Sequence, residues 1–293
     1  MVNEQTGPTS HFFVSQRLRM HYVDWGNREA PPIVLVHGGR DHARSWDWVA
    51  RDLRRDHHVI ALDLRGHGDS AWAIGSLYHV IEMVIDLAQL IDAIDEERVA
   101  LICHSLGSLV GAQYTGARPE RISKFVAIEG IDVPKRFRRV IDGISPRDQL
   151  CQTIDNVQRQ AARPPRRYPS IDAAATRMRE ENAFLSDEQA HHLTEHGVAR
   201  NEDGTYSWKF DDYARDPKMT RTGKDDVGEI LSHIECPVLL IRGTESDAPD
   251  PEESGLLARL RNARAVAVEG AGHWVHHDQL DEVLRLTRGF LEE

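Results

Sequence analysis

The stretch "VALICHSLGSLVGAQY", residues 99–114, decides how the chain can be interpreted. It is an apolar run that ends at a histidine and a serine and is followed at once by small residues. Such a run is typical of a strand buried on both faces, and the small residues after it favour a helix that begins where the strand ends. The stretch therefore predicts a sharp turn at Ser105, of the kind that presents a serine hydroxyl above a sheet.

The same pattern recurs along the chain. Aliphatic runs without alternation, each ending in glycine or polar residues, are "PPIVLVHGG" (31–39), "HVIALDLRGHG" (58–68), "KFVAIEG" (124–130), "PVLLIRG" (237–243) and "RAVAVEGAGH" (264–273). Apolar residues at helical spacing over 80–94 predict a helix between two of them. Two shorter strands around Ser15 and Gln16 predict a hairpin. The succession of strands and helices along the chain predicts a mostly parallel sheet with helices on both faces and with functional groups at the carboxyl ends of its strands.

The succession of strands and helices stops over residues 133–232. This segment contains helix-like stretches, a Pro/Arg-rich piece and the turn-like "NEDGTYSW", without an evident buried strand. We interpret it as an inserted helical cap over a core formed by residues 1–132 and 233–293, with its underside lining a substrate pocket.

Composition narrows the class of protein. The chain has 293 residues, 36 basic and 47 acidic side chains and a formal net charge of −11, which disfavours nucleic acid and anionic lipid surfaces as partners. Three cysteines without a paired spacing predict reduced thiols in the cytoplasm. We find neither a secretory signal pattern nor an apolar run long enough to span a membrane.

Ser105 is the candidate nucleophile. A serine hydroxyl needs a neighbouring base, and the base needs a third group that orients it. The loop "EGAGHWVHHDQL" (269–280) provides the base, and we favour His273 over His276 and His277, which would lie at the start of the last helix. A buried, hydrogen-bonded serine without a catalytic role is the alternative interpretation of the turn.

The orienting acid is expected after the penultimate strand. "LLIRGTESDAPDP" (239–251) contains three acidic residues there, of which Asp247 is favoured over Glu245 and Asp250. Glu129, directly after the strand that follows the turn helix, is the second candidate.

The glycine pair after the first buried run completes the predicted site. Glycines let the backbone approach a ligand closely, so the N–H groups of Gly39 and Leu106 are the expected donors to an oxyanion. Trp274, Arg40 and His104 are weaker candidates for contact with substrate. Cys103 lies within the predicted strand and is expected to be a buried packing residue rather than a nucleophile.

These segments occur in the order HGG, serine, acid, histidine, and with "DLRGHGDSAW" (63–72) and "ARPERI" (117–122) the chain resembles an α/β-hydrolase with a cap over essentially its whole length. The resemblance implies an α/β-hydrolase fold and a serine triad. Two positions depart from the family pattern: Cys103 replaces the first glycine of the GxSxG turn, and Leu280 stands where a proline is common. "RGTESDA" resembles the form of the acid loop in which the aspartate comes one residue later.

The expected activity is hydrolysis of a carboxylic ester or lactone of a small molecule through an acyl-enzyme, without a metal or organic cofactor. The resemblance also implies that an aspartate would replace Ser105 in a haloalkane dehalogenase or an epoxide hydrolase. A hydrolase of carbon–carbon bonds in ring-cleavage products, and a small-molecule sensor with little turnover, remain the alternatives.

Overall fold

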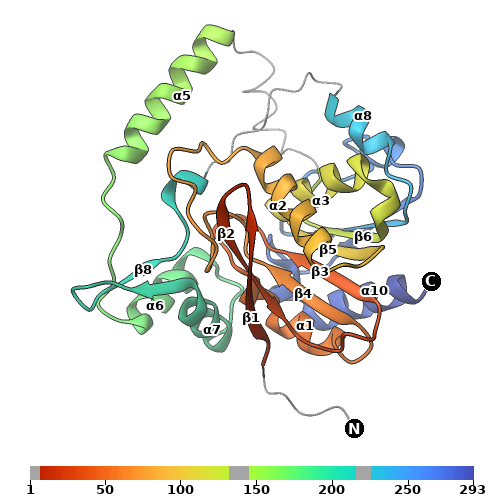
Figure 1. Ribbon diagram of the computed structural model, residues 1–293, viewed down its shortest axis with the longest axis horizontal. Coiled ribbons are helices and arrows are strands. Elements are labelled where there is room, and N and C mark those ends of the chain that lie inside the picture. Colours follow the sequence, from red (N-terminus) through yellow and green to blue (C-terminus); the bar gives the residue numbers. More distant parts are fainter. Residues whose placement is uncertain (1–6, 132–144, 216–225) are drawn as a thin grey trace.

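The computed structural model describes residues 7–131, 145–215 and 226–293 (Figure 1). Its central feature is an eight-stranded sheet with the order β1-β2-β4-β3-β5-β6-β9-β10. The strands are β1 (Thr9–Ser15), β2 (Leu18–Asp24), β3 (Pro32–Val36), β4 (His58–Leu62), β5 (Val99–His104), β6 (Ile122–Ile128), β9 (Val238–Gly243) and β10 (Ala263–Val268).

The expected parallel sheet is confirmed. From β4 to β10 all neighbouring strands are parallel, whereas β2 pairs antiparallel with both β1 and β4. The predicted hairpin is the β1–β2 pair. Its turn residues Gln16 and Arg17 have φ values of 47° and 70°, the left-handed conformation that a two-residue hairpin turn requires.

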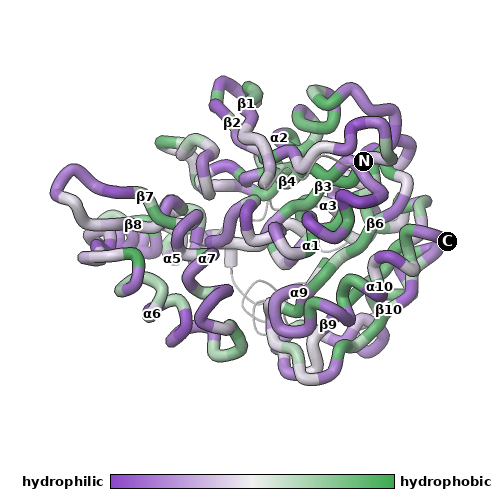
Figure 2. The backbone as a smooth tube through the Cα atoms, turned by 90° about the horizontal axis from the view of Figure 1, so that it is seen from below, coloured by the Kyte–Doolittle hydropathy of each residue, from purple (hydrophilic) through white to green (hydrophobic). Residues whose placement is uncertain are grey.

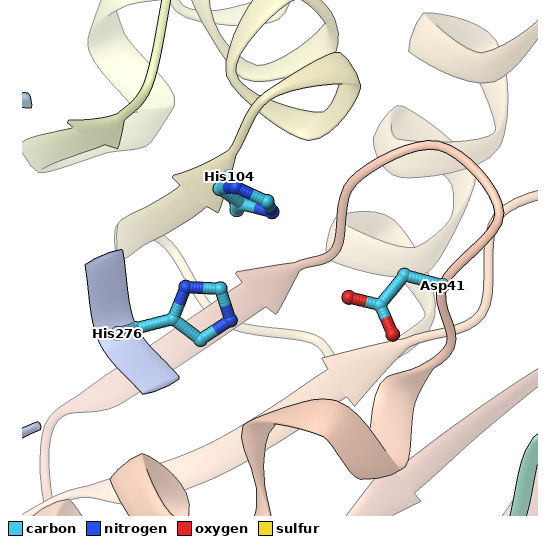
Figure 3. Close-up of side chains that lie close together, drawn as sticks. All are labelled: Asp41, His104 and His276. Carbon is cyan, nitrogen blue, oxygen red and sulfur yellow. The ribbon is translucent and has the colours of Figure 1, made fainter. Parts of the chain in front are cut away.

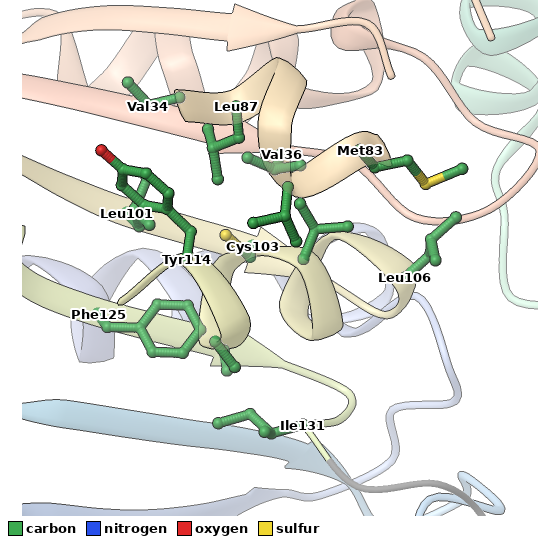
Figure 4. Packing of buried hydrophobic residues seen from close by; sticks show 14 of the residues in the cluster. Val34, Val36, Met83, Leu87, Leu101, Cys103, Leu106, Tyr114, Phe125 and Ile131 are labelled. Atoms are coloured by element: carbon green, nitrogen blue, oxygen red, sulfur yellow. The ribbon is translucent and has the colours of Figure 1, made fainter. Parts of the chain in front are cut away.

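The apolar runs lack alternation because both faces of the sheet are covered. In β5, Leu101 and Cys103 belong to one buried cluster, whereas Ala100 and Ile102 belong to the cluster on the other face. Figure 4 shows the first cluster between the sheet and its helices. Figure 2 shows the same pattern along the backbone, with hydrophobic strands inside and hydrophilic segments outside.

The helices of the core lie on both sides of this sheet (Figure 1). They are α1 (Asp47–Leu53), α2 (Val80–Ala93), α3 (Leu106–Ala117), α8 (Asp226–Ser232), α9 (Val275–Asp278) and α10 (Leu280–Glu292), and short 3-10 turns η1 (Ala43–Trp46), η2 (Pro119–Arg121) and η4 (Leu257–Arg259) complete the core. The helix predicted over 80–94 is α2, with Met83, Leu87 and Leu90 buried against the sheet.

The predicted cap segment forms a lobe beside the sheet (Figure 1). It contains α5 (Pro146–Ala161), α6 (Ile171–Glu181), α7 (Asp187–Gly197), the 3-10 turn η3 (Asp212–Arg215), and a short antiparallel ribbon of β7 (Val198–Arg200) and β8 (Tyr206–Trp208). The prediction of a helical segment thus missed this ribbon, whose strands are too short to give an alternating pattern. Ser170 and Ser186 cap α6 and α7 by accepting hydrogen bonds from backbone N–H groups.

Hydrogen bonds attach this lobe to the core. His42 bonds through Nε2 to the Leu193 carbonyl of α7 at 2.8 Å, and Gln189 donates to the His277 carbonyl at 2.9 Å. The last part of the predicted cap, α8, instead packs on α3, where a Cβ added at Gly116 would lie 2.2 Å from the Ile230 carbonyl oxygen. The end of segment 133–232 therefore contacts the core helices directly.

Within the described ranges, no helix combines the length and the apolar character that crossing a membrane requires.

Candidate active site

Ser105 lies in the sharp turn between β5 and α3. Its φ is 50° and its ψ is −113°, a combination that persists only where the surrounding structure imposes it. The Ser105 N–H is held by the carbonyl of Ile128, the last residue of β6, at 2.9 Å. The turn also needs a glycine two residues later, because a Cβ at Gly107 would lie 2.4 Å from the Val36 carbonyl oxygen.

Cys103 occupies the position where the family pattern has a glycine. It is fully buried, and its Sγ would lie 2.7 Å from a Cβ added at Gly111. Burial raises the pKa of the Cys103 thiol, so the neutral thiol is the stable form. Cys103 thus packs against a gap that Gly111 of α3 leaves open, which explains how the turn accommodates a residue larger than glycine.

His273 lies in the loop between β10 and α9, with its imidazole beside Ser105. His273 Nε2 and Ser105 Oγ are 2.9 Å apart. The side chain of His273 is 53% exposed, so a substrate can reach the base from solvent. The structure therefore brings together the nucleophile and the base that the sequence predicts.

The third member of this chain differs from the prediction. His273 Nδ1 lies 3.0 Å from Glu129 Oε2. Asp247, the favoured acid, is an exposed residue of the loop after β9, and its assignment as the orienting partner is wrong. Glu129, the second candidate, occupies that position instead.

Glu129 is well suited to hold a negative charge beside the histidine. Its side chain is fully buried, and its Oε1 accepts the N–H of Gly243 at 2.8 Å. Ser246 donates its hydroxyl to Oε2, the oxygen that also faces His273. Burying a carboxylate is costly unless hydrogen bonds compensate, and here both oxygens have partners.

Glu129 can contact His273 in place of Asp247 for a simple geometric reason. Glu129 follows β6 and Ser246 follows β9, and these two strands are neighbours in the sheet. An acid at either strand end can therefore reach the same histidine. The sequence indicated Glu129 as a candidate because it directly follows a buried strand. Its spacing from Ser105 and His273 gave no reason to prefer it to Asp247.

The glycine loop after β3 lies against the turn. A Cβ added at Gly38 would lie 3.2 Å from the Cβ of Ser105, and one added at Gly39 would lie 3.8 Å from Leu106 Cδ2. Among the described residues, the N–H groups of Gly39 and Leu106 donate no hydrogen bond. Both are thus available near the serine, which is the arrangement expected of oxyanion donors.

The weaker candidates occupy different positions. Arg40 is exposed, with a φ of 65°. Trp274 packs partly buried against the cluster of Leu185, Ala190 and Leu193 in the lobe. His104 is buried, and its Nε2 lies 2.8 Å from the carbonyl oxygen of His273, so it lies beneath the site and its expected contact with substrate is not supported.

The sequence did not predict two features around His273. Phe184 of the lobe is 55% exposed, and its ring would lie 3.0 Å from a Cβ added at Gly272; it therefore borders the loop that carries His273. His276 and His277, expected at the start of the last helix, lie in the short helix α9 that precedes it and are buried. A groove of about 680 Å³ between α6 and α7 is lined by residues of the lobe and does not include Ser105, Glu129 or His273.

Comparisons with known proteins show the family of the chain. Residues 33–286 match the model of the alpha/beta hydrolase family. The chain is 31% identical to an esterase of Escherichia coli (strain K12), YbfF, over 89% of this chain and 93% of that protein. It is 23% identical to epoxide hydrolase 1 of Caenorhabditis elegans over 99% of this chain and 72% of that protein.

Among solved structures, a thioesterase domain from the curacin biosynthetic pathway superposes with a TM-score of 0.82 at 22% identity, covering 96% of this chain and 99% of that one. The family match spans β3 to α10, and thus includes Ser105, Glu129 and His273. The parallel sheet, the strained serine turn and the extent of this match lead to one conclusion: the chain is a hydrolase that belongs to the alpha/beta hydrolase family.

Proposed function

We propose that this hydrolase cleaves a carboxylic ester of a small molecule, with Ser105 as the nucleophile. The observation that carries the proposal is the continuous hydrogen-bonded chain from Ser105 Oγ to His273 Nε2 at 2.9 Å and from His273 Nδ1 to Glu129 Oε2 at 3.0 Å. A carboxylate at Nδ1 fixes the tautomer that leaves Nε2 free to accept the serine proton.

The arrangement supports a two-step acyl transfer. Ser105 Oγ attacks the ester carbonyl while His273 takes its proton, and Glu129 stabilises the imidazolium that forms. The N–H groups of Gly39 and Leu106 hold the oxyanion. His273 then protonates the leaving alcohol, and in the second step it activates a water molecule that releases the acid and restores Ser105.

The relatives support acyl transfer over the other chemistries of the family. Two of the matched proteins are named as an esterase and a thioesterase domain. The epoxide hydrolase is 23% identical to this chain, against 31% for the esterase, and a serine at position 105 disfavours the aspartate nucleophile expected of that class. The net charge of −11 favours a neutral small molecule over nucleic acid. Cys103, Cys151 and Cys236 are free thiols, which supports a cytoplasmic location.

A panel of aryl esters of increasing acyl length tests this function. Wild-type protein is expected to turn over at least one member many times, and Ser105→Ala to lose activity on the order of 10⁴-fold or more. Ser232→Ala is the matched control, because its hydroxyl donates only within its own helix, to the Glu229 carbonyl. Intact-mass analysis of a rapidly quenched reaction should show an acyl adduct on wild type and none on Ser105→Ala.

Three results would contradict the proposal. Undiminished hydrolysis by Ser105→Ala would remove the nucleophile. Cleavage of a vinylogous diketone with no cleavage of any ester would assign the same triad to carbon–carbon bonds. Binding of an ester that stabilises the protein without repeated turnover would favour a sensor.

A further inference from the structure

Three buried side chains from distant segments meet beneath the active-site serine. Asp41 follows the glycine loop after β3, His104 ends β5, and His276 lies in α9. Figure 3 shows them turned toward a common space. One ligand atom from each lies within 4.8 Å of the other two, and their residues are 4%, 1% and 1% exposed.

Four polar atoms in this cluster lack hydrogen-bond partners, whereas Asp41 Oδ1 accepts the N–H of His42. Asp41 Oδ2, His104 Nδ1 and both ring nitrogens of His276 form no hydrogen bond within the described structure. Every neutral imidazole carries an N–H that needs an acceptor, and a buried polar atom without a partner destabilises the folded state. Such atoms converging on one space indicate an occupant that binds them all.

The tautomer of His104 favours a metal ion as that occupant. Its Nε2 must carry the proton, because it donates to the His273 carbonyl oxygen at 2.8 Å, so Nδ1 has a free lone pair. Histidines that bind metals usually donate their other ring N–H to a carbonyl or carboxylate in this way. His104 is therefore already held in the form that a metal requires.

The surroundings also restrict the second imidazole. His276 stacks on Trp46 with ring centroids 4.6 Å apart and lies edge-on to His104 at 4.7 Å. His277 lies beside it with ring centroids 4.2 Å apart, so three aromatic neighbours confine the ring. Two imidazole nitrogens and one carboxylate form a donor set that suits divalent transition metals and does not suit Mg²⁺ or Ca²⁺, which prefer oxygen ligands only.

We propose that Asp41, His104 and His276 form a binding site for a divalent transition-metal ion such as Zn²⁺, and that the bound ion inhibits hydrolysis. The inhibition rests on the proposed function, whereas the binding does not. The sequence predicts no metal here, since residues 41, 104 and 276 form no recognisable spacing; only the fold brings them together.

The inhibition follows from the position of His104. Its ring centroid lies 5.0 Å from that of His273, and its N–H holds the backbone carbonyl of the same histidine. A positive charge on His104 would oppose formation of the His273 imidazolium, which exists only during the reaction. The ion should therefore lower kcat and leave KM nearly unchanged.

Binding is tested without reference to activity. Chelator-treated protein is titrated with Co²⁺, monitored by its visible absorption, and dialysed against Zn²⁺ for metal analysis. Wild type is expected to bind one tightly held ion per chain, and His276→Gln and Asp41→Asn to bind it about tenfold more weakly or worse. His233→Gln, which removes an exposed histidine directly after α8, is the control and should bind as wild type does.

Circular dichroism and thermal unfolding establish which variants fold, and Asp41→Asn serves if His276→Gln does not. Equal affinity in wild type and in the folded cluster variant, or no stoichiometric binding by wild type, would overturn the site and leave water as its occupant.

Ester hydrolysis then tests the coupling. Zn²⁺ at a concentration that saturates the site should lower kcat at least tenfold in wild type and His233→Gln, with reversal by a chelator, and should have little effect on His276→Gln. Stoichiometric binding without inhibition would overturn the coupling. A protein that binds the ion but hydrolyses no ester would contradict the proposed function and leave the metal site intact.

Discussion

Ser246 donates its hydroxyl to Glu129, across the ends of the neighbouring strands β9 and β6. The resemblance to the family implies the acid of a triad at the position three residues past Gly243, which is Ser246 in this chain. The residue at the usual acid position thus supports an acid that comes from the next strand of the sheet. This relationship determines which substitutions should abolish activity.

Glu129→Gln should lower kcat by about 10³–10⁴-fold. The amide can present its NH₂ group to His273 Nδ1 and so favour the tautomer whose Nε2 carries a proton and cannot accept one from Ser105. Asp247→Asn is the matched control and should keep kcat within about twofold. Steady-state hydrolysis of an aryl ester provides the measurement, and a larger loss in the Asp247 variant would restore the original assignment.

A carboxylate at the end of the neighbouring strand β9 should be able to replace that of Glu129. Ser246 already contacts the Glu129 oxygen that faces His273, so an aspartate there can reach the same histidine. Glu129→Ala combined with Ser246→Asp should therefore be roughly tenfold or more active than Glu129→Ala alone. Equal kcat values for the single and double variants would show that the loop after β9 cannot place a carboxylate at Nδ1.

Cys103 should tolerate reduction in size and resist enlargement. Cys103→Ala is expected to fold and to remain active, since the buried thiol makes no contribution to the chemistry. Cys103→Leu should destabilise the protein by about 1–3 kcal/mol, because a Cβ added at Gly111 would already meet Cys103 Sγ at 2.7 Å and the ring of Phe125 at 3.1 Å, so little space remains around the thiol.

Denaturant unfolding and kcat together measure this effect. Gly111→Ala provides a matched test, because it would crowd the same contact from the helix side. Wild-type stability and activity in Cys103→Leu would show that the turn is less tightly packed than the structure indicates.

Acid should destabilise the fold through histidines that are buried in the neutral form. Burial lowers the pKa of His37 to about 3, whereas an unfolded histidine titrates near 6.5. His37 Nδ1 bonds to the Gly38 carbonyl, and Nε2 accepts the N–H of Leu64. A second proton on Nε2 would face that N–H, and the Asp63 carboxylate 3.9 Å away offsets only part of the effect of burial. The pKa of its neighbour His67 is lowered by burial as well.

The sign of the effect follows from proton binding. Between the unfolded pKa near 6.5 and the folded value near 3, the unfolded state binds more protons, so stability is complete above pH 6.5 and falls as the pH decreases. The loss is about 2 kcal/mol for His37 at pH 5. Urea unfolding at pH 7.5 and pH 5.0 measures it, and equal free energies of unfolding at the two values would contradict the prediction.

The local elements of this fold could be predicted from the sequence. Runs buried on both faces identified the parallel strands, because a sheet covered by helices leaves no solvent-facing side to produce alternation. The local sequence pattern also predicted the position of Ser105, since the strand, the turn and the helix are contiguous in the chain. It failed for β7 and β8, where three residues per strand carry too little periodicity.

The partners of these residues were decided by the tertiary structure. Glu129 and Asp247 both follow buried strands, and only the positions of β6 and β9 beside the loop of His273 determine which carboxylate reaches the imidazole. The same holds for Asp41, His104 and His276, which share a space only after three segments have packed. A sequence pattern indicates which side chains a single strand, turn or helix carries. A site formed from several such elements depends on the distances between their side chains, which are set only when the sheet assembles.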